Sequence, residues 1–150
     1  MTKWMISIVV SLFILGCQAH TYSDNRSGSA QPITAAKFAD NPEQYNSKQV
    51  VVRGYLAPAG RDLIVYPSKQ EADASNYFEN AVRVYDTSPG RVLGLEVIKD
   101  EINCTQHFVE LTGVGGILKG RGFYGIVEIL EIRRFENAQF LGEGEVCFSA

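Results

Sequence analysis

The sequence predicts a small, mainly β domain: a closed barrel of five strands with one or two short helices, behind a cleaved signal peptide and a flexible tether. Five segments rich in β-branched and aromatic residues predict the strands. Two of these segments carry a glycine after alternating apolar residues, which predicts the sharp bends that a small barrel needs. An apolar run that ends at a cysteine, close to the first residue, predicts the leader.

The leader occupies residues 1–16. Lys3 gives it a positive start, and residues 4–15, WMISIVVSLFIL, form an apolar run that only Ser7 and Ser11 interrupt. Such a run is too short to cross a hydrocarbon core, which needs about 20 residues, but it is typical of a signal peptide.

The segment Ile14-Leu15-Gly16-Cys17 resembles the lipobox of bacterial lipoproteins. That resemblance implies that a diacylglyceryl group is attached to the sulfur of Cys17, that the leader is cut before this cysteine, and that the new amino group is acylated. Two or more acyl chains anchor a protein durably, whereas one chain is marginal. Gln18 stands where an aspartate would resemble an inner-membrane retention signal, so we expect the outer membrane, with the domain facing the periplasm.

Two alternatives stay open for this segment. An ordinary cleavage site around Cys17-Gln18-Ala19 would release a soluble secreted protein, and an uncleaved apolar run would itself act as an anchor. Leu15 is larger than the residue that usually holds its place in a lipobox.

The composition of the mature chain limits the classes of partner that we expect. Cleavage before Cys17 leaves 134 residues, enough for one domain with a core, and these carry 13 basic and 17 acidic residues. A formal charge of −4 argues against nucleic acid as a general partner, because such binding depends on a positive surface. The charge gives no attraction to anionic lipid either, so we expect the lipid anchor to make the membrane contact.

Cys104 and Cys147 remain after the lipidated cysteine is set aside. We expect a disulfide between them, because paired thiols outside the cytoplasm are oxidised. The alternative is a metal-binding or redox site, since Cys104 and His107 have ligand-type spacing and Cys147 could complete three ligands. We expect neither a metal nor another cofactor.

A tether over residues 17–32 leads to a domain over residues 33–150. The tether sequence QAHTYSDNRSGSAQP is polar and cannot bury enough apolar surface to order itself. Thr34 predicts the cap of a short helix over residues 35–40. Asn41 followed by Pro42 predicts the capped start of another helix.

The predicted strands cover residues 49–56, 62–66, 81–85, 107–113 and 123–133. Between the third and fourth, residues 88–103 predict a helix, with coil and a short strand as the alternative. The first and fourth strands share a pattern, Val50-x-Val52-x-Gly54 and Val109-x-Leu111-x-Gly113. Three strands, a helix and two strands, with the first and fourth bent at glycine, is the order of an OB-fold, a five-stranded Greek-key barrel.

Residues 41–56, NPEQYNSKQVVVRGYL, resemble the opening of small exported OB-fold proteins related to the tRNA-anti-like family. The later stretch FVELTGVGGILKGRGFYGIVEILEI resembles their closing pair of strands, and the resemblance covers about residues 33–133. Ser47 stands where that family usually has glycine, so we expect the turn there to differ. The family name implies nucleic acid, but many exported members look like binding modules of unknown ligand, and fold alone does not fix function.

We expect a protein that is not an enzyme. Histidine occurs only as His20, in the tether, and His107, and the sequence has neither G-x-S-x-G nor H-E-x-x-H. The glycine-rich stretch over residues 113–122 lacks the spacing of a phosphate-binding loop and predicts a hairpin.

A doubled Arg-x-Tyr is the candidate ligand face. Arg53 and Tyr55 point to one side of their strand, as do Arg83 and Tyr85, because side chains alternate along a strand. If the two strands are neighbours, two guanidinium groups and two phenol rings share one face, where arginine binds carboxylate or phosphate and aromatic rings stack on sugars or bases. The alternative is an ordinary half-exposed barrel wall.

The sequence therefore predicts a bacterial envelope lipoprotein whose domain acts as a binding or interaction module. Its partner is an envelope protein or a small-molecule ligand that the sequence does not identify. The alternatives are an oligonucleotide- or oligosaccharide-binding OB domain, a metal-binding or redox protein that uses Cys104, His107 and Cys147, and a structural subunit of an envelope complex.

Overall fold

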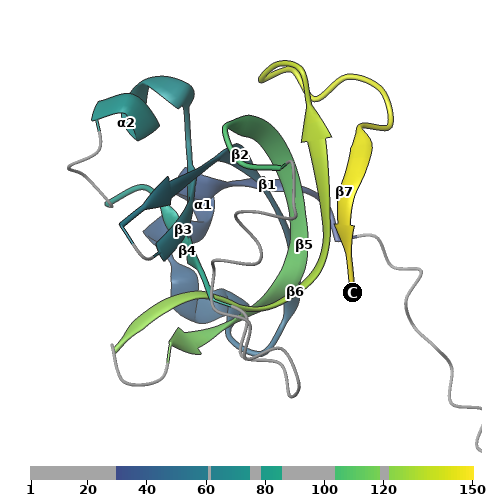
Figure 1. Ribbon diagram of the computed structural model, residues 1–150. Helices are drawn as coiled ribbons and strands as arrows, with labels where there is room; N and C mark the ends of the chain where they lie inside the picture. The colour runs from purple at the N-terminus through teal and green to yellow at the C-terminus, as the bar shows by residue number, and fades with distance from the viewer. Residues whose placement is uncertain (1–29, 61, 75–78, 86–103, 119–121) are drawn as a thin grey trace, which may run out of the picture.

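The computed structural model describes residues 30–60, 62–74, 79–85, 104–118 and 122–150 (Figure 1). These residues form a mainly β structure of seven strands with two short α-helices and one 3-10 helix. The strands are β1 (Ile33–Thr34), β2 (Gln49–Ala59), β3 (Asp62–Tyr66), β4 (Val82–Val84), β5 (His107–Leu118), β6 (Phe123–Phe135) and β7 (Glu145–Ser149). The helices are α1 (Ala35–Asp40), η1 (Pro42–Tyr45) and α2 (Lys69–Ala74).

Three predictions lie outside the described residues: the leader with Cys17, nearly all of the tether, and the helix or coil over residues 88–103. Within the ranges that the structure describes, no helix is long and apolar enough to cross a bilayer.

The strand pairings return to their starting strand. β2 pairs antiparallel with β3, β3 antiparallel with β4, β4 parallel with β6, β6 antiparallel with β5, and β5 antiparallel with β2. β2 serves two neighbours because it is long: residues 49–56 pair with β5, and residues 55–59 pair with β3. β1 adds a short parallel pairing to β2, and β7 pairs antiparallel with the last residues of β6 (Figure 1).

Glycines stand where backbones approach closely. A Cβ added to Gly54 would collide with the carbonyl oxygen of Tyr66 and lie 2.6 Å from Cγ1 of Val65. A Cβ added to Gly113 would lie 2.5 Å from the carbonyl oxygen of Glu128, beside a register shift in the β5–β6 pairing. Glycine at these two positions therefore permits the close approach that the sequence pattern predicted.

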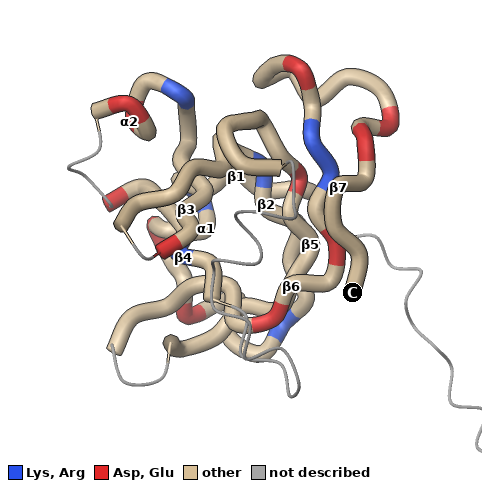
Figure 2. Tube along the Cα trace, viewed as in Figure 1, with Lys and Arg blue, Asp and Glu red and all other residues tan. Residues whose placement is uncertain are grey.

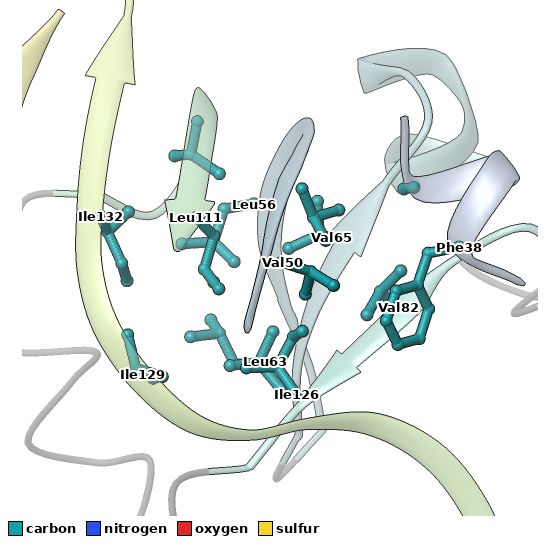
Figure 3. Packing of buried hydrophobic residues seen from close by; sticks show 14 of the residues in the cluster. Phe38, Val50, Leu56, Leu63, Val65, Val82, Leu111, Ile126, Ile129 and Ile132 are labelled. Atoms are coloured by element: carbon teal, nitrogen blue, oxygen red, sulfur yellow. The ribbon is translucent and has the colours of Figure 1, made fainter. Parts of the chain in front are cut away.

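The core lies between the strands and uses one side of each. Val50, Val52 and Leu56 of β2 are buried in it, at alternate positions, as the period of a strand requires. The other strands contribute Leu63, Val65, Val82, Val84, Val109, Leu111, Ile126, Ile129 and Ile132 (Figure 3). Phe38 of α1 is 1% exposed and closes this core beside Val82 (Figure 3).

Helix α1 begins as predicted. Thr34 has an extended backbone, and its Oγ1 accepts a hydrogen bond from the backbone N of Lys37 at 3.2 Å. The second predicted start is correct only in part. Pro42 begins η1, but the side chain of Asn41 makes no cap hydrogen bond, because its backbone angles of −149° and 68° belong to the turn between two helices.

The turn after η1 depends on Ser47. Its φ of 59° lies in the left-handed region, and its backbone N donates to the carbonyl oxygen of Gly115 at 2.8 Å. Serine thus adopts the backbone conformation for which glycine is the usual residue, so the turn forms with some strain.

The strand predictions needed correction at their ends. β5 continues to Leu118 and β6 to Phe135, so the two form a longer hairpin than the sequence pattern indicated. β1, α2 and β7 were not predicted from the sequence.

Candidate functional site

Arg53 lies in a cross-strand network on the outer side of β2 and β5. Its register partner is Glu110, and Nε and Nη2 of Arg53 both lie 2.8 Å from Oε2 of that carboxylate. The ring of Phe140, from the loop between β6 and β7, lies 5.1 Å from the guanidinium carbon. The charge of Arg53 is thus already paired and partly covered.

Tyr55 is 7% exposed. Its hydroxyl donates to the carbonyl oxygen of Gln106 at 3.0 Å, and its ring meets Phe108 edge-on at 5.2 Å. The phenol therefore holds the chain before β5 in place. A ring this buried is not available for stacking on a ligand.

Arg83 has a second, separate set of partners. Its Nη1 lies 3.1 Å from Oδ2 of Asp62, and its guanidinium carbon lies 4.2 Å from the centre of the Phe123 ring. Burial raises the pKa of the neighbouring Tyr66, and the positive charge of Arg83 offsets part of that rise. This arginine therefore joins three strands: β3 through Asp62, its own β4, and β6 through Phe123.

Tyr85 is the exposed member of the four. Its side chain is 46% exposed, while its backbone N donates to the carbonyl oxygen of Ile126 at 2.8 Å, so the pairing of β4 with β6 extends to it. Arg83 and Tyr85 consequently lie on one side of the chain, two residues apart. We name Asp62, Arg83, Tyr85 and Phe123 the Arg83 surface.

The four predicted face residues do not form one cluster. β3 separates β2 from β4, and Arg83 is paired through Ile64 with Ala57 of β2. Arg53 lies four residues along β2 from that position, which is about 13 Å along a strand. The structure thus divides the doubled Arg-x-Tyr into two pairs that differ in their tyrosines, since Tyr55 is buried and Tyr85 is exposed, whereas both arginines are half-buried and paired with a carboxylate. Ligand binding by either pair stays a prediction.

The partners of the arginines were missed from the sequence. Asp62, Glu110, Phe123 and Phe140 are single residues with nothing unusual around them, and only strand register brings them to the arginines. Glu110 had a weak signal, since it is a charged residue inside the predicted strand over residues 107–113, and Asp62 stands only at the start of its predicted strand.

Cys104 and Cys147 are joined in a disulfide, with Cα atoms 5.7 Å apart. Cys104 is fully buried, and Cys147 lies in β7, so the bond ties that strand to the chain just before β5. The alternative metal site needs two free thiolates, and both sulfurs are used in the bond. Nδ1 of His107 lies 3.0 Å from the carbonyl oxygen of Thr105. Among the described residues, no three histidine, cysteine, aspartate or glutamate side chains are grouped to hold a metal.

Comparisons of the chain with protein-family models, with curated proteins and with solved structures found no match. The resemblance to exported OB-fold proteins therefore stays a prediction from the sequence.

Proposed function

We propose that this chain is a lipid-anchored protein of the bacterial envelope whose OB-like barrel serves as a binding module. The observation that carries the proposal is the cycle of pairings β2–β3–β4–β6–β5–β2, together with a core enclosed by those five strands. A five-stranded Greek-key barrel with this strand order is the OB architecture, which binds ligands on one outer face and in the adjoining loops.

The anchor rests on Ile14-Leu15-Gly16-Cys17 and is tested separately. Expressed in a bacterium, the protein should incorporate labelled palmitate and enter the detergent-rich phase of a phase-separating nonionic detergent, because two or more acyl chains hold a protein at a bilayer. Cys17→Ser should abolish both properties. A wild-type protein that stays in the aqueous phase, without label, would remove the anchor from the proposal.

The Arg83 surface is where we place ligand binding. The guanidinium carbon of Arg83 lies 4.2 Å from the centre of the Phe123 ring, and Tyr85, two residues along the chain, is 46% exposed; we expect this combination to suit a planar or ring-shaped ligand that carries acceptor groups. Oligosaccharides fit this surface better than nucleic acids, because the mature chain carries a formal charge of −4.

The test uses Tyr85→Ala, since removing an exposed ring leaves the core intact, with Lys37→Ala, at an exposed position of α1, as the matched control. Binding of chitotetraose and of an oligothymidylate is measured by calorimetry at low and high salt, and the melting temperature of each variant is recorded. Loss of chitotetraose binding in Tyr85→Ala alone, at unchanged melting temperature, supports the proposal. Salt-sensitive binding of the oligothymidylate would favour the nucleic-acid alternative. If neither probe binds the wild type, the Arg83 surface is an ordinary barrel wall.

A further inference from the structure

A pocket of about 520 Å³ lies away from the Arg83 surface, where the loop between β6 and β7 folds beside the start of β5. Its volume falls in the range of small-molecule sites. The residues that line it and enter the argument are His107, Arg134, Phe135, Glu136, Leu141 and Glu145. The position of β6 opposite Arg83 is Gly125, nine residues from Arg134, so the two regions are about 30 Å apart along the strand.

The wall of this pocket is held in place by the loop itself. Phe140, with a φ of 51°, packs its ring edge-on against Phe135 at 5.3 Å and Phe108 at 6.2 Å. The side chain of Asn137 accepts from the backbone N of Gln139 at 3.0 Å, and Arg133 donates to the carbonyl oxygen of Glu143 at 3.1 Å. A loop fixed at three points gives a preformed pocket, which loses less conformational entropy when a ligand binds.

The polar groups that line the pocket include two donors, the side-chain NH2 of Asn137 and the guanidinium of Arg134, beside the carboxylates and the ring of His107. Nδ1 of His107 must carry a hydrogen, because its partner, the carbonyl oxygen of Thr105, can only accept. In the neutral ring, Nε2 is therefore an acceptor. Arg134 is already engaged, since its Nε donates to Oε2 of Glu145 at 2.8 Å and its Nη2 reaches the same oxygen.

The charge of the pocket is negative. Arg134 and Glu145 neutralise one another, whereas Glu136 forms no ion pair with any other residue that the structure describes. Figure 2 shows acidic positions along the β6–β7 loop, next to the basic positions at the adjoining end of β6. Beside these groups, Leu141 is 74% exposed, which leaves apolar surface uncovered at the same pocket.

We infer that this pocket binds a small organic cation, namely an alkyl-ammonium group whose charge meets Glu136 and Nε2 of His107 and whose hydrocarbon part covers Leu141. An ammonium group has three donors and no acceptor, so it complements the carboxylate of Glu136 and the ring acceptor of His107. The hydrocarbon part gains by covering apolar surface that water otherwise contacts. The group comes either from a free amine or from a lysine side chain.

The test titrates the oxidised protein with hexylamine, hexanol and hexanoate, which differ in charge and share their hydrocarbon chain. Amide NMR signals of His107, Glu136, Leu141 and Gly144 should shift in a saturable manner with hexylamine. The affinity for hexanol and hexanoate should be lower by about two- to fivefold, the usual value of an ion pair at an exposed carboxylate such as Glu136. Nα-acetyl-lysinamide identifies the source: binding as tight as that of hexylamine indicates a lysine side chain, and weaker binding indicates a free amine.

Glu136→Gln should weaken hexylamine binding by about two- to fivefold, because it removes the charge of an exposed carboxylate and keeps its shape. Glu71→Gln, an equally exposed change on α2, is the matched control and should bind as the wild type does. Leu141→Ser, at an exposed position that folding does not need, should weaken hexylamine and hexanol alike. Equal binding of hexylamine and hexanol, an unchanged affinity in Glu136→Gln, or the absence of saturable shifts at the pocket would each overturn the inference. None of these results depends on Tyr85 or on the anchor, so the proposed function is tested independently.

Discussion

Removing the Cys104–Cys147 disulfide should destabilise the domain by a calculable amount. The bond closes a loop of 43 residues. In the chain-entropy model, the cross-link lowers the conformational entropy of the unfolded chain, by an amount that grows with the logarithm of loop length. For a loop of this size, the cross-link raises the free energy of unfolding by about 4 kcal/mol. A domain of this size is usually stable by only about 5–15 kcal/mol, so the reduced protein should be close to unfolding at moderate temperature.

The assay is urea unfolding of the oxidised protein, of the same protein after reduction, and of the Cys104→Ala/Cys147→Ala variant. Reduction changes no side-chain volume beyond two hydrogens, so it isolates the cross-link. The double variant adds the cost of a small cavity at buried Cys104, and it should be less stable than the reduced protein by about 1 kcal/mol. The urea dependence should also steepen on reduction, because an uncrosslinked chain exposes more surface when it unfolds.

One result would refute this reasoning. If reduction lowers the free energy of unfolding by less than about 1 kcal/mol and leaves the urea dependence unchanged, the loop is already constrained in the unfolded state or the bond does not form in the purified protein. Mass spectrometry after alkylation decides between these. An oxidised protein should take up alkylating reagent at Cys104 and Cys147 only after reduction.

Four further changes test the packing. Phe38→Ala should lower the free energy of unfolding by about 3–5 kcal/mol, since the ring is 1% exposed, and a loss under 1 kcal/mol in urea unfolding would show that α1 does not close the core. Gly54→Ala should cost about 1–3 kcal/mol in the same assay, because its Cβ meets a carbonyl oxygen that belongs to a paired strand; a neutral result would mean that β2 and β3 can move apart. Ser47→Gly should raise the melting temperature slightly, since relief of about 1–2 kcal/mol of left-handed strain exceeds the 0.5–1 kcal/mol that glycine's freedom in the unfolded chain costs; an unstable variant would contradict the φ of 59°. Because the pKa of Tyr66 is raised by burial, the folded state holds the phenol proton more tightly than the unfolded state does. The free energy of unfolding should therefore be independent of this group below pH 10 and fall as the pH rises above 10. In Tyr66→Phe, the free energy of unfolding should depend less on pH above pH 10.

Local signals in the sequence were sufficient where a residue acts on its own neighbours. Thr34 caps α1 because its hydroxyl needs only the backbone three residues later, and alternating valines on β2 mark the buried side without knowledge of the partner strand. Gly54 and Gly113 predicted close approach for the same reason, since few other constraints place glycine inside a strand.

Information that depends on register was not accessible from the sequence. The doubled Arg-x-Tyr predicted a shared face, but β3 lies between the two strands and the offset along β2 takes Arg53 to Glu110 and Arg83 to Asp62. The β6–β7 pocket was missed because its wall is a loop whose shape depends on one ring, Phe140, packing against residues of other strands. Neither the strand register nor the packing of Phe140 produces a local pattern in the sequence.

The double pairing of β2 has a consequence for how fast this chain acquires its structure. In the pairing of β2 with β5, Val50 lies opposite Gly113 and Leu56 opposite His107, so this pairing joins segments that are more than fifty residues apart. Contacts between such distant segments stabilise the chain only after a large loop has closed, and closing that loop costs conformational entropy first. Proteins dominated by contacts of this kind therefore fold in milliseconds to seconds rather than microseconds. Until β2 has paired with β5, the apolar residues and unpaired edges of both strands are accessible to other chains. The lifetime of this partly folded state, more than the stability of the native state, therefore sets how readily newly made molecules aggregate.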